Sequence, residues 1–220
     1  MKKLIITEGA DDKKFFIGLL SYLRVAGVEV VEINPKQKGR GSKANLFNID
    51  DISSAINAET EELESKILII CDADFEEEGV DLSGFTASKS AAEKILEVLK
   101  NNKEHQEQNK NKKIEFFIIP NNEIDGNLES LYLNCLAIDQ SSMKCVEDYL
   151  KCLSKKISLQ QNPKMKAFSL LAPIGLKDAV HKVGFAACLD EKNKKHREGY
   201  WDFESPALKP LSDFLKNYFN

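Results

Sequence analysis

The chain has 220 residues, a length that fits one large α/β domain or a core domain with a helical appendage. Its net charge of −4 does not by itself indicate nucleic-acid binding, although a local basic patch can dominate binding. No stretch approaches the roughly 18 apolar residues that a membrane span needs. The five cysteines contain no C-x-x-C pair, which argues against a zinc ribbon or a disulfide framework. We therefore expect a cytoplasmic protein with reduced thiols.

Strands alternate with helices along the first part of the chain. Short runs of β-branched and aliphatic residues predict strands at 3–7, 28–33, 66–71 and 114–119. Apolar residues at helical spacing predict helices at 11–24, 44–57 and 87–101. This alternation predicts an α/β fold with a parallel, Rossmann-like sheet of about four strands and helices on both faces. Ligands bind beyond the carboxyl ends of such strands.

The pattern after residue 141 predicts mostly helices, at 143–154, 164–172, 177–183 and 207–218. We expect residues 1–135 to form the α/β core. Residues 136–220 are expected to form a helical C-terminal extension that packs on the core as one structural unit.

Acidic side chains follow the first and third predicted strands. Glu8 comes directly after the first strand, and Asp72 and Asp74 follow the apolar run 67–70. A carboxylate at the end of an apolar strand is costly unless it is exposed or paired, which makes Glu8 a candidate site residue. Alternate residues that leave a strand point the same way, so Asp72 and Asp74 would chelate one hard cation. Because such a cluster repels itself unless a cation or a proton neutralises it, Mg²⁺ or Mn²⁺ is the predicted cofactor.

The aspartates also have simpler explanations, whereas Glu8 is harder to explain as a structural residue. Asp11 or Asp12 can cap the helix that follows Gly9, because helix N-termini favour negative charge. A D-x-D pattern occurs by chance in many chains as exposed loop aspartates. Nucleotide-sugar transferases and phosphatases also use versions of it.

In combination, the motifs resemble the TOPRIM domain. An E-G-x-x-D pattern from Glu8 to Asp12 follows the first strand, and the D-x-D pattern of Asp72 and Asp74 comes about 60 residues further along. TOPRIM domains are shared by topoisomerases, bacterial primases, and nucleases of the OLD and ribosomal-RNA maturase types. The resemblance implies that Glu8 is a general acid/base or a metal ligand and that Asp72 and Asp74 bind Mg²⁺. Asp12 stands where OLD-type nucleases use an acidic residue.

Later segments extend the resemblance along the chain. A Pro-loop-Gly-x-x-Glu pattern that ends at Glu129, and the segment 199–211, are similar to small stand-alone bacterial TOPRIM-like proteins of unknown function. These proteins are relatives of OLD-type nucleases. Glu129 is therefore a candidate metal ligand. The alternative is a first-turn glutamate of a helix, where the helix dipole favours it.

Basic residues are candidates for contacts with nucleic acid. Glycines are interleaved with four cations in the loop after the second strand, and such a loop can hold a phosphodiester; the cations are Lys36, Lys38, Arg40 and Lys43. The alternative is an exposed flexible loop. OLD-type nucleases place a lysine near their metals, and the resemblance points to Lys166 for that catalytic role.

The predicted function is Mg²⁺-dependent cleavage of phosphodiester bonds in nucleic acid. One alternative is a non-catalytic regulatory module that binds a metal or a nucleotide. Another is a D-x-D nucleotidyl or sugar-nucleotide transferase, against which the glutamate after the first strand argues. A Rossmann dinucleotide site is disfavoured because no G-x-G-x-x-G follows that strand. The substrate and the oligomeric state stay open, with a homodimer among the options.

Overall fold

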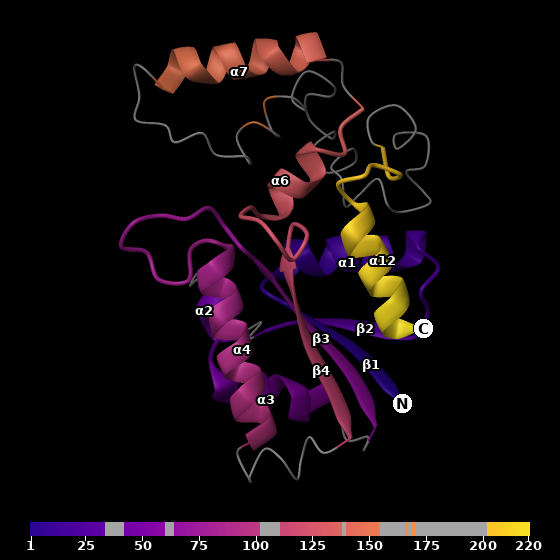
Figure 1. Ribbon diagram of the computed structural model, residues 1–220. Coiled ribbons are helices and arrows are strands. Elements are labelled where there is room, and N and C mark those ends of the chain that lie inside the picture. Colours follow the sequence, from indigo (N-terminus) through magenta and orange to yellow (C-terminus); the bar gives the residue numbers. More distant parts are fainter. Residues whose placement is uncertain are drawn as a thin grey trace.

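A computed structural model describes residues 1–33, 42–59, 64–101, 111–137, 140–154, 166, 169 and 202–220. Within these residues, four strands form one sheet in the order β2-β1-β3-β4 (Figure 1). Every neighbouring pair is parallel, which confirms the predicted fold class. The strands are β1 (Lys2–Thr7), β2 (Val28–Glu32), β3 (Ser65–Asp72) and β4 (Lys112–Ile119).

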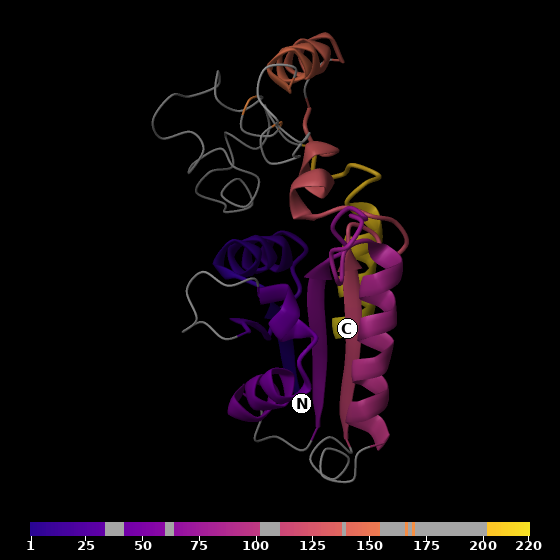
Figure 2. The same ribbon diagram turned by 90° about the vertical axis from the view of Figure 1, so that its left-hand side faces the viewer.

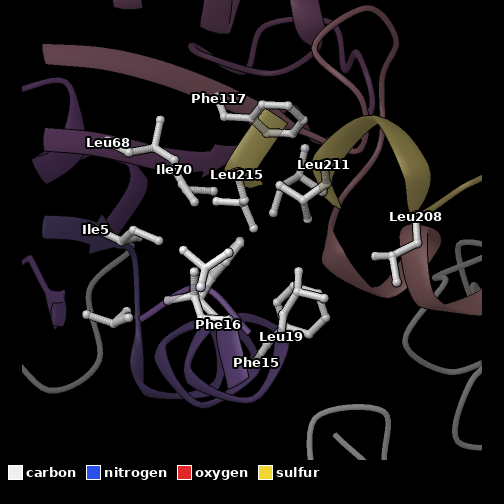
Figure 3. Close-up of a cluster of buried hydrophobic side chains, with 14 of the residues drawn as sticks. Ile5, Phe15, Phe16, Leu19, Leu68, Ile70, Phe117, Leu208, Leu211 and Leu215 are labelled. Carbon is white, nitrogen blue, oxygen red and sulfur yellow. The ribbon is translucent and has the colours of Figure 1, made fainter. Parts of the chain in front are cut away.

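Helices cover both faces of the sheet, as predicted. On one face, α1 (Ala10–Tyr22) and α12 (Lys209–Phe219) pack against inward-facing residues of the strands (Figure 3). On the other face lie α2 (Ser42–Leu46), α3 (Ile49–Glu59) and α4 (Phe85–Asn101). Two further helices, α6 (Leu128–Leu133) and α7 (Gln140–Ser154), lie beyond the carboxyl ends of the strands (Figures 1 and 2).

β3 is buried on both faces, which explains its continuous apolar run. Leu68 and Ile70 belong to the core under α1 and α12, whereas Ile67 and Ile69 belong to the core under α2, α3 and α4. Side chains alternate across a strand, so one apolar run supplies both cores. Each fully buried aliphatic side chain of this kind contributes about 1.5–3 kcal/mol.

Two helices replace the single helix that was predicted at 44–57, and that prediction was wrong. The side chain of Asn48 interrupts the helix because its Oδ1 accepts hydrogen bonds from the backbone N–H groups of Asp50 and Asp51, at 2.9 and 3.2 Å. An asparagine that satisfies the first N–H groups of a helix acts as an N-cap, so α3 begins anew after it.

The C-terminal helix α12 is part of the core of the sheet. The hydroxyl of Tyr218 lies 2.8 Å from the carbonyl oxygen of Ile67 and 2.7 Å from that of Lys113, near the start of β3 and β4. Upstream of α12, the backbone N–H of Asp202 donates to the carbonyl of Cys135 at 2.7 Å. These bonds fix both ends of the C-terminal segment, at Asp202 and Tyr218, to the rest of the fold.

Other predicted features fall partly outside the described residues. The helices expected at 164–172 and 177–183 lie there, apart from Lys166 and Ser169. Among the helices that are described, none combines the length and the apolar character needed to cross a lipid bilayer.

Candidate functional site

The direction in which the chain adds strands to the sheet reverses between β1 and β3. The chain passes from β1 to β2 on one side, and later from β3 to β4 on the other, so β1 and β3 are central neighbours. In open α/β sheets, the crevice beyond the strand ends at such a switch point is the usual ligand site. Glu8 directly follows β1 and Asp72 is the last residue of β3. The topology therefore brings the two predicted carboxylates together.

A narrow recess lies at this switch point. Its acidic lining consists of Glu8, Asp12 and Asp72, and the remaining walls are formed by Phe16, Ile70, Cys71 and Ile119. One carboxylate oxygen of Glu8, Oε1, is buried from solvent. Three of the five predicted metal ligands thus meet in one place, and they come from two segments that are about 60 residues apart in the chain.

The carboxyl group of Asp72 is strongly perturbed by its surroundings. Its pKa is raised well above the ordinary range, first by burial and then by the negative charges of Glu8, Asp12, Asp74 and Glu129. Burial and like charges both disfavour the ionised form. A proton or a cation placed at this carboxylate relieves both effects.

A backbone donor holds Asp72 in position. Its Oδ1 accepts a hydrogen bond of 3.0 Å from the N–H of Leu128, the first residue of α6. The N-terminal turn of a helix carries partial positive charge, so it stabilises the carboxylate that it contacts. α6 therefore docks on the end of β3 through this bond.

Asp12 has two roles in the structure. Its Oδ2 accepts a hydrogen bond of 3.1 Å from the N–H of Gly9, which is the N-cap of α1. The helix-capping explanation of Asp12 is therefore confirmed. The same side chain lines the recess, because the first turn of α1 begins directly beyond β1.

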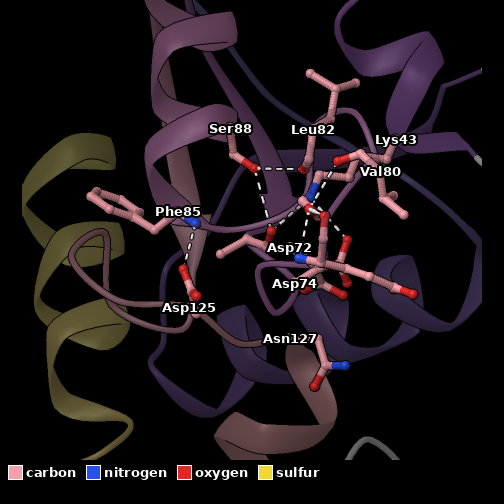
Figure 4. Close-up of polar contacts among 12 residues, drawn as sticks. Lys43, Asp72, Asp74, Val80, Leu82, Phe85, Ser88, Asp125 and Asn127 are labelled. Atoms are coloured by element: carbon pink, nitrogen blue, oxygen red, sulfur yellow. Dashed lines mark hydrogen bonds and ion pairs between the residues drawn. The ribbon is translucent and has the colours of Figure 1, made fainter.

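Asp74 is directed differently from Asp72. The expectation that both point the same way assumed a continued strand, but β3 ends at Asp72. Asp74 has a φ of 60° and forms an antiparallel bridge with Gly126, with N–H···O distances of 2.7 and 2.9 Å. Its Oδ2 lies 2.9 Å from the Nζ of Lys43 (Figure 4). Asp74 stays close enough to affect the pKa of Asp72 but does not line the recess.

Of the four loop cations predicted to contact nucleic acid, Lys43 lies within the residues that the structure describes. Lys43 turns inward, with its side chain only 13% exposed, and is not displayed for a backbone contact with nucleic acid. The other loop candidates, Lys36, Lys38 and Arg40, lie outside the described residues.

Lys166 is placed beside α7, where its ammonium pairs with the carboxylate of Glu147. α7 is separated from the sheet by α6 (Figure 1). The structure therefore groups the proposed catalytic lysine with α7 and not with the acidic recess.

Glu129 lies in the first turn of α6, which confirms the simpler explanation of this residue. Tyr132 lies three residues further along α6, close enough for the charge of Glu129 to act on its phenol. Burial raises the pKa of the Tyr132 phenol, and the charges of Glu129, Asp72 and Asp11 raise it further. Tyr132 was not predicted as a site residue. The available signal was its spacing of three residues from Glu129, which places both side chains on one side of a helix.

Asp125 was also missed. Its Oδ1 accepts a 2.6 Å hydrogen bond from the N–H of Phe85 at the start of α4 (Figure 4). Its Oδ2 accepts one of 3.2 Å from the N–H of Glu76. Asp125 therefore ties the loop after β3 to the loop after β4. The Asp-Gly pair at 125–126 is typical of a turn. The backbone N–H groups that Asp125 binds, those of Glu76 and Phe85, are remote in sequence and leave no local signal.

The residues fit a hard divalent cation in chemistry. Carboxylate oxygens are the ligands that Mg²⁺ and Mn²⁺ prefer. The pKa of Asp72 is raised first by burial and then by the neighbouring carboxylates. Across the described part of the chain, however, no three His, Cys, Asp or Glu side chains are arranged so that they could hold a metal ion. Protein donors hold three of the carboxylates: Gly9 on Asp12, Leu128 on Asp72 and Lys43 on Asp74.

The fold and the site define an α/β protein with a doubly wound parallel sheet and an acidic recess at its switch point. The chain belongs to DUF3226, a protein family of unknown function whose profile matches residues 2–220. No curated protein and no solved structure matches the chain.

Proposed function

We propose that this protein is a TOPRIM-like enzyme of the cytosol that cleaves phosphodiester bonds in nucleic acid with Mg²⁺ or Mn²⁺. The observation that carries the proposal is the meeting of Glu8, Asp12 and Asp72 in one recess at the carboxyl ends of β1 and β3. These are the positions that the E-G-x-x-D and D-x-D motifs single out. Acidic side chains that approach one another beyond a parallel sheet support a cation site better than a structural role.

The residues of the recess divide the work in this proposal. Asp72 and Asp12 would hold the cation, because their oxygens line the recess and each is already oriented by a backbone N–H group. When bound, the cation would activate a water and stabilise negative charge on the phosphate. Glu8 is assigned to proton transfer, because one of its oxygens is shielded from bulk solvent in the same recess.

A second candidate function is a regulatory module that binds a metal or a nucleotide without turnover. The observation in its favour is that Asp12, Asp72 and Asp74 already have protein donors and that the recess is narrow. Because these donors already offset part of the negative charge, the carboxylates depend less on a cation for stabilisation than those of an open catalytic cluster would.

A cleavage assay separates the two candidates. Labelled single- and double-stranded DNA and RNA are incubated with the protein in Mg²⁺, in Mn²⁺ and in EDTA. We expect cleavage that needs the metal and falls by at least about 100-fold in Glu8→Gln and Asp72→Asn. Asp81→Asn is the matched control, because Asp81 is an exposed carboxylate of the loop after β3 that does not line the recess.

Undiminished cleavage by both recess variants would refute the site assignment. Absence of cleavage on every substrate, together with a Mn²⁺-dependent rise in melting temperature that Asp72→Asn abolishes, would favour the regulatory module.

A further inference from the structure

Three lysines lie side by side at the amino end of the sheet. Lys3 of β1 is in register with Lys66 of β3, and Lys66 is in register with Lys113 of β4. Residues in register on parallel strands project from the same face, and neighbouring strands are about 4.8 Å apart. These three residues, the lysine row, therefore carry three positive charges across about 10 Å of one face.

The lysine row is on the face of the sheet that α1 and α12 cover. Lys66 and Leu68 share a face because they are two residues apart in β3, and Leu68 belongs to the core under those helices. The Nζ of Lys113 lies 4.8 Å from the ring centroid of Tyr218, near the end of α12. In Figure 1 this is the end of the sheet marked N, away from α6.

The positive charges of the lysine row are only partly balanced. Lys113 forms an ion pair of 2.8 Å with Glu115, which lies two residues further along β4. In the part of the chain that the structure describes, Lys3 and Lys66 pair with no carboxylate. Like charges on neighbouring strands repel one another. Strand formation does not explain such a row, whereas the binding of an anion does.

The helix α12 accounts for one member of the row. Tyr218, in its last turn, donates a hydrogen bond to the carbonyl of Lys113, and the partial negative charge at a helix C-terminus favours a nearby cation. Lys3 and Lys66 are half-buried and Lys113 is exposed. Lysines of this kind lay their aliphatic stems on the protein and keep their ammonium groups in solvent. A ligand in solution can therefore reach the row.

The lysine row is remote from the acidic recess. Lys66 and Asp72 lie near opposite ends of β3, and about 20 Å of extended chain separates them. The Debye length at physiological ionic strength is about 8 Å, so the attraction of the row for an anion is largely screened from the carboxylates of the recess.

We propose that the lysine row binds the phosphate backbone of a nucleic acid, at a surface separate from the recess. Three ammonium groups in a line match the repeated single charges of a phosphodiester chain, and each offers three N–H donors to phosphate oxygens. Contacts of this kind are made to the backbone and carry no sequence preference. The inference goes beyond the proposed cleavage and requires no metal ion.

Fluorescence anisotropy of a labelled single strand of about 20 nucleotides tests the proposal. DNA and RNA are compared in EDTA, so that metal-dependent cleavage does not interfere. Replacement of Lys3, Lys66 and Lys113 together with glutamine should weaken binding at least about tenfold at about 50 mM salt. The slope of log affinity against log salt should fall by about 2, because three phosphate contacts are lost.

A matched triple variant controls for net charge. It replaces three exposed lysines of α1 and α4 with glutamine: Lys14, Lys89 and Lys94. Its net charge equals that of the row variant, and its affinity should stay within about threefold of the wild type. Circular dichroism verifies folding. Lys66→Glu, a single change in the middle of the row, is the second variant and should also weaken binding at least about tenfold.

Equal weakening by the two triple variants would overturn the proposal, because net charge and not the row would then govern binding. Absence of binding by the wild type at about 100 μM protein would overturn it as well. Inorganic polyphosphate offers similar phosphate chemistry and serves as competitor. Row-dependent binding of polyphosphate, without binding of DNA or RNA, would overturn the assignment to nucleic acid.

The result is independent of the proposed cleavage. Glu8→Gln should bind the labelled strands in EDTA as the wild type does, since Glu8 lies at the other end of β1. Loss of cleavage in that variant would therefore leave the lysine row unaffected, and loss of binding in the row variant would leave the assignment of the recess intact.

Discussion

Replacing Asp72 with asparagine removes one negative charge from the recess and keeps the shape of the side chain. The asparagine oxygen can still accept the hydrogen bond from Leu128, which is 3.0 Å long. The loss is the charge-assisted part of that bond, about 1 kcal/mol. The gain is larger, because burying a charge costs several kcal/mol per ion and the neighbouring carboxylates add repulsion. We therefore expect metal-free Asp72→Asn to be more stable than the wild type near pH 8, by at least about 1 kcal/mol.

The direction of the pKa shift sets the pH dependence. In the unfolded chain, Asp72 has its ordinary pKa of 3.8, whereas in the folded chain burial and then the charge of Glu8 raise it. The native state holds the proton more tightly, so this group's contribution to stability is present below the unfolded pKa and is lost as pH rises towards the folded pKa. Asparagine does not titrate. The advantage of the variant should therefore be small near pH 4 and grow as the pH rises.

Thermal and urea unfolding in EDTA, at several pH values between about 4 and 8, measure this difference. For a chain of this size, 1 kcal/mol corresponds to a shift of about 2–4 °C in melting temperature. Asp81→Asn is the control for removal of an exposed charge. A variant less stable than the wild type near pH 8, or a difference that stays constant with pH, would refute the reasoning.

Three other substitutions or treatments test the surroundings of the site and the core. Gly126→Ala should destabilise the protein by about 1–3 kcal/mol in urea unfolding, because φ is +147° and the added Cβ would lie 2.7 Å from Oγ of Ser130. An unchanged unfolding midpoint would contradict this. Tyr218→Phe should cost about 1–3 kcal/mol, since it removes the hydroxyl that anchors α12 to two backbone carbonyls; a loss below the error of the measurement would show that water replaces it. Burial, followed by the charge of Glu8, raises the pKa of the Cys71 thiol, so a disulfide reagent near neutral pH should modify exposed Cys145 at once and Cys71 only on unfolding. Peptide mass spectrometry reads out both sites, and rapid labelling of native Cys71 would contradict its burial.

Local sequence properties were enough to find the strands and most of the helices. The period of apolar residues is a short-range signal, and it located β1 and β3 within a residue of their ends. It failed at α2 and α3, because the cap formed by Asn48 depends on hydrogen-bond geometry that periodicity does not carry. Strand ends also marked Glu8 and Asp72 as chemically unusual, since carboxylates seldom follow apolar runs without a reason.

The sequence by itself thus determined which segments form the sheet and which acidic residues leave its strands. Only the tertiary structure decided that β1 and β3 are neighbours, because strand order depends on pairing between residues far apart in the chain. The same holds for the turn that directs Asp74 to Lys43 and for the docking of α6 on Asp72, which are set by contacts across the fold. The D-x-D motif supplied Asp72 and Asp74. Long-range packing gave them different partners, the backbone N–H of Leu128 for Asp72 and the ammonium of Lys43 for Asp74.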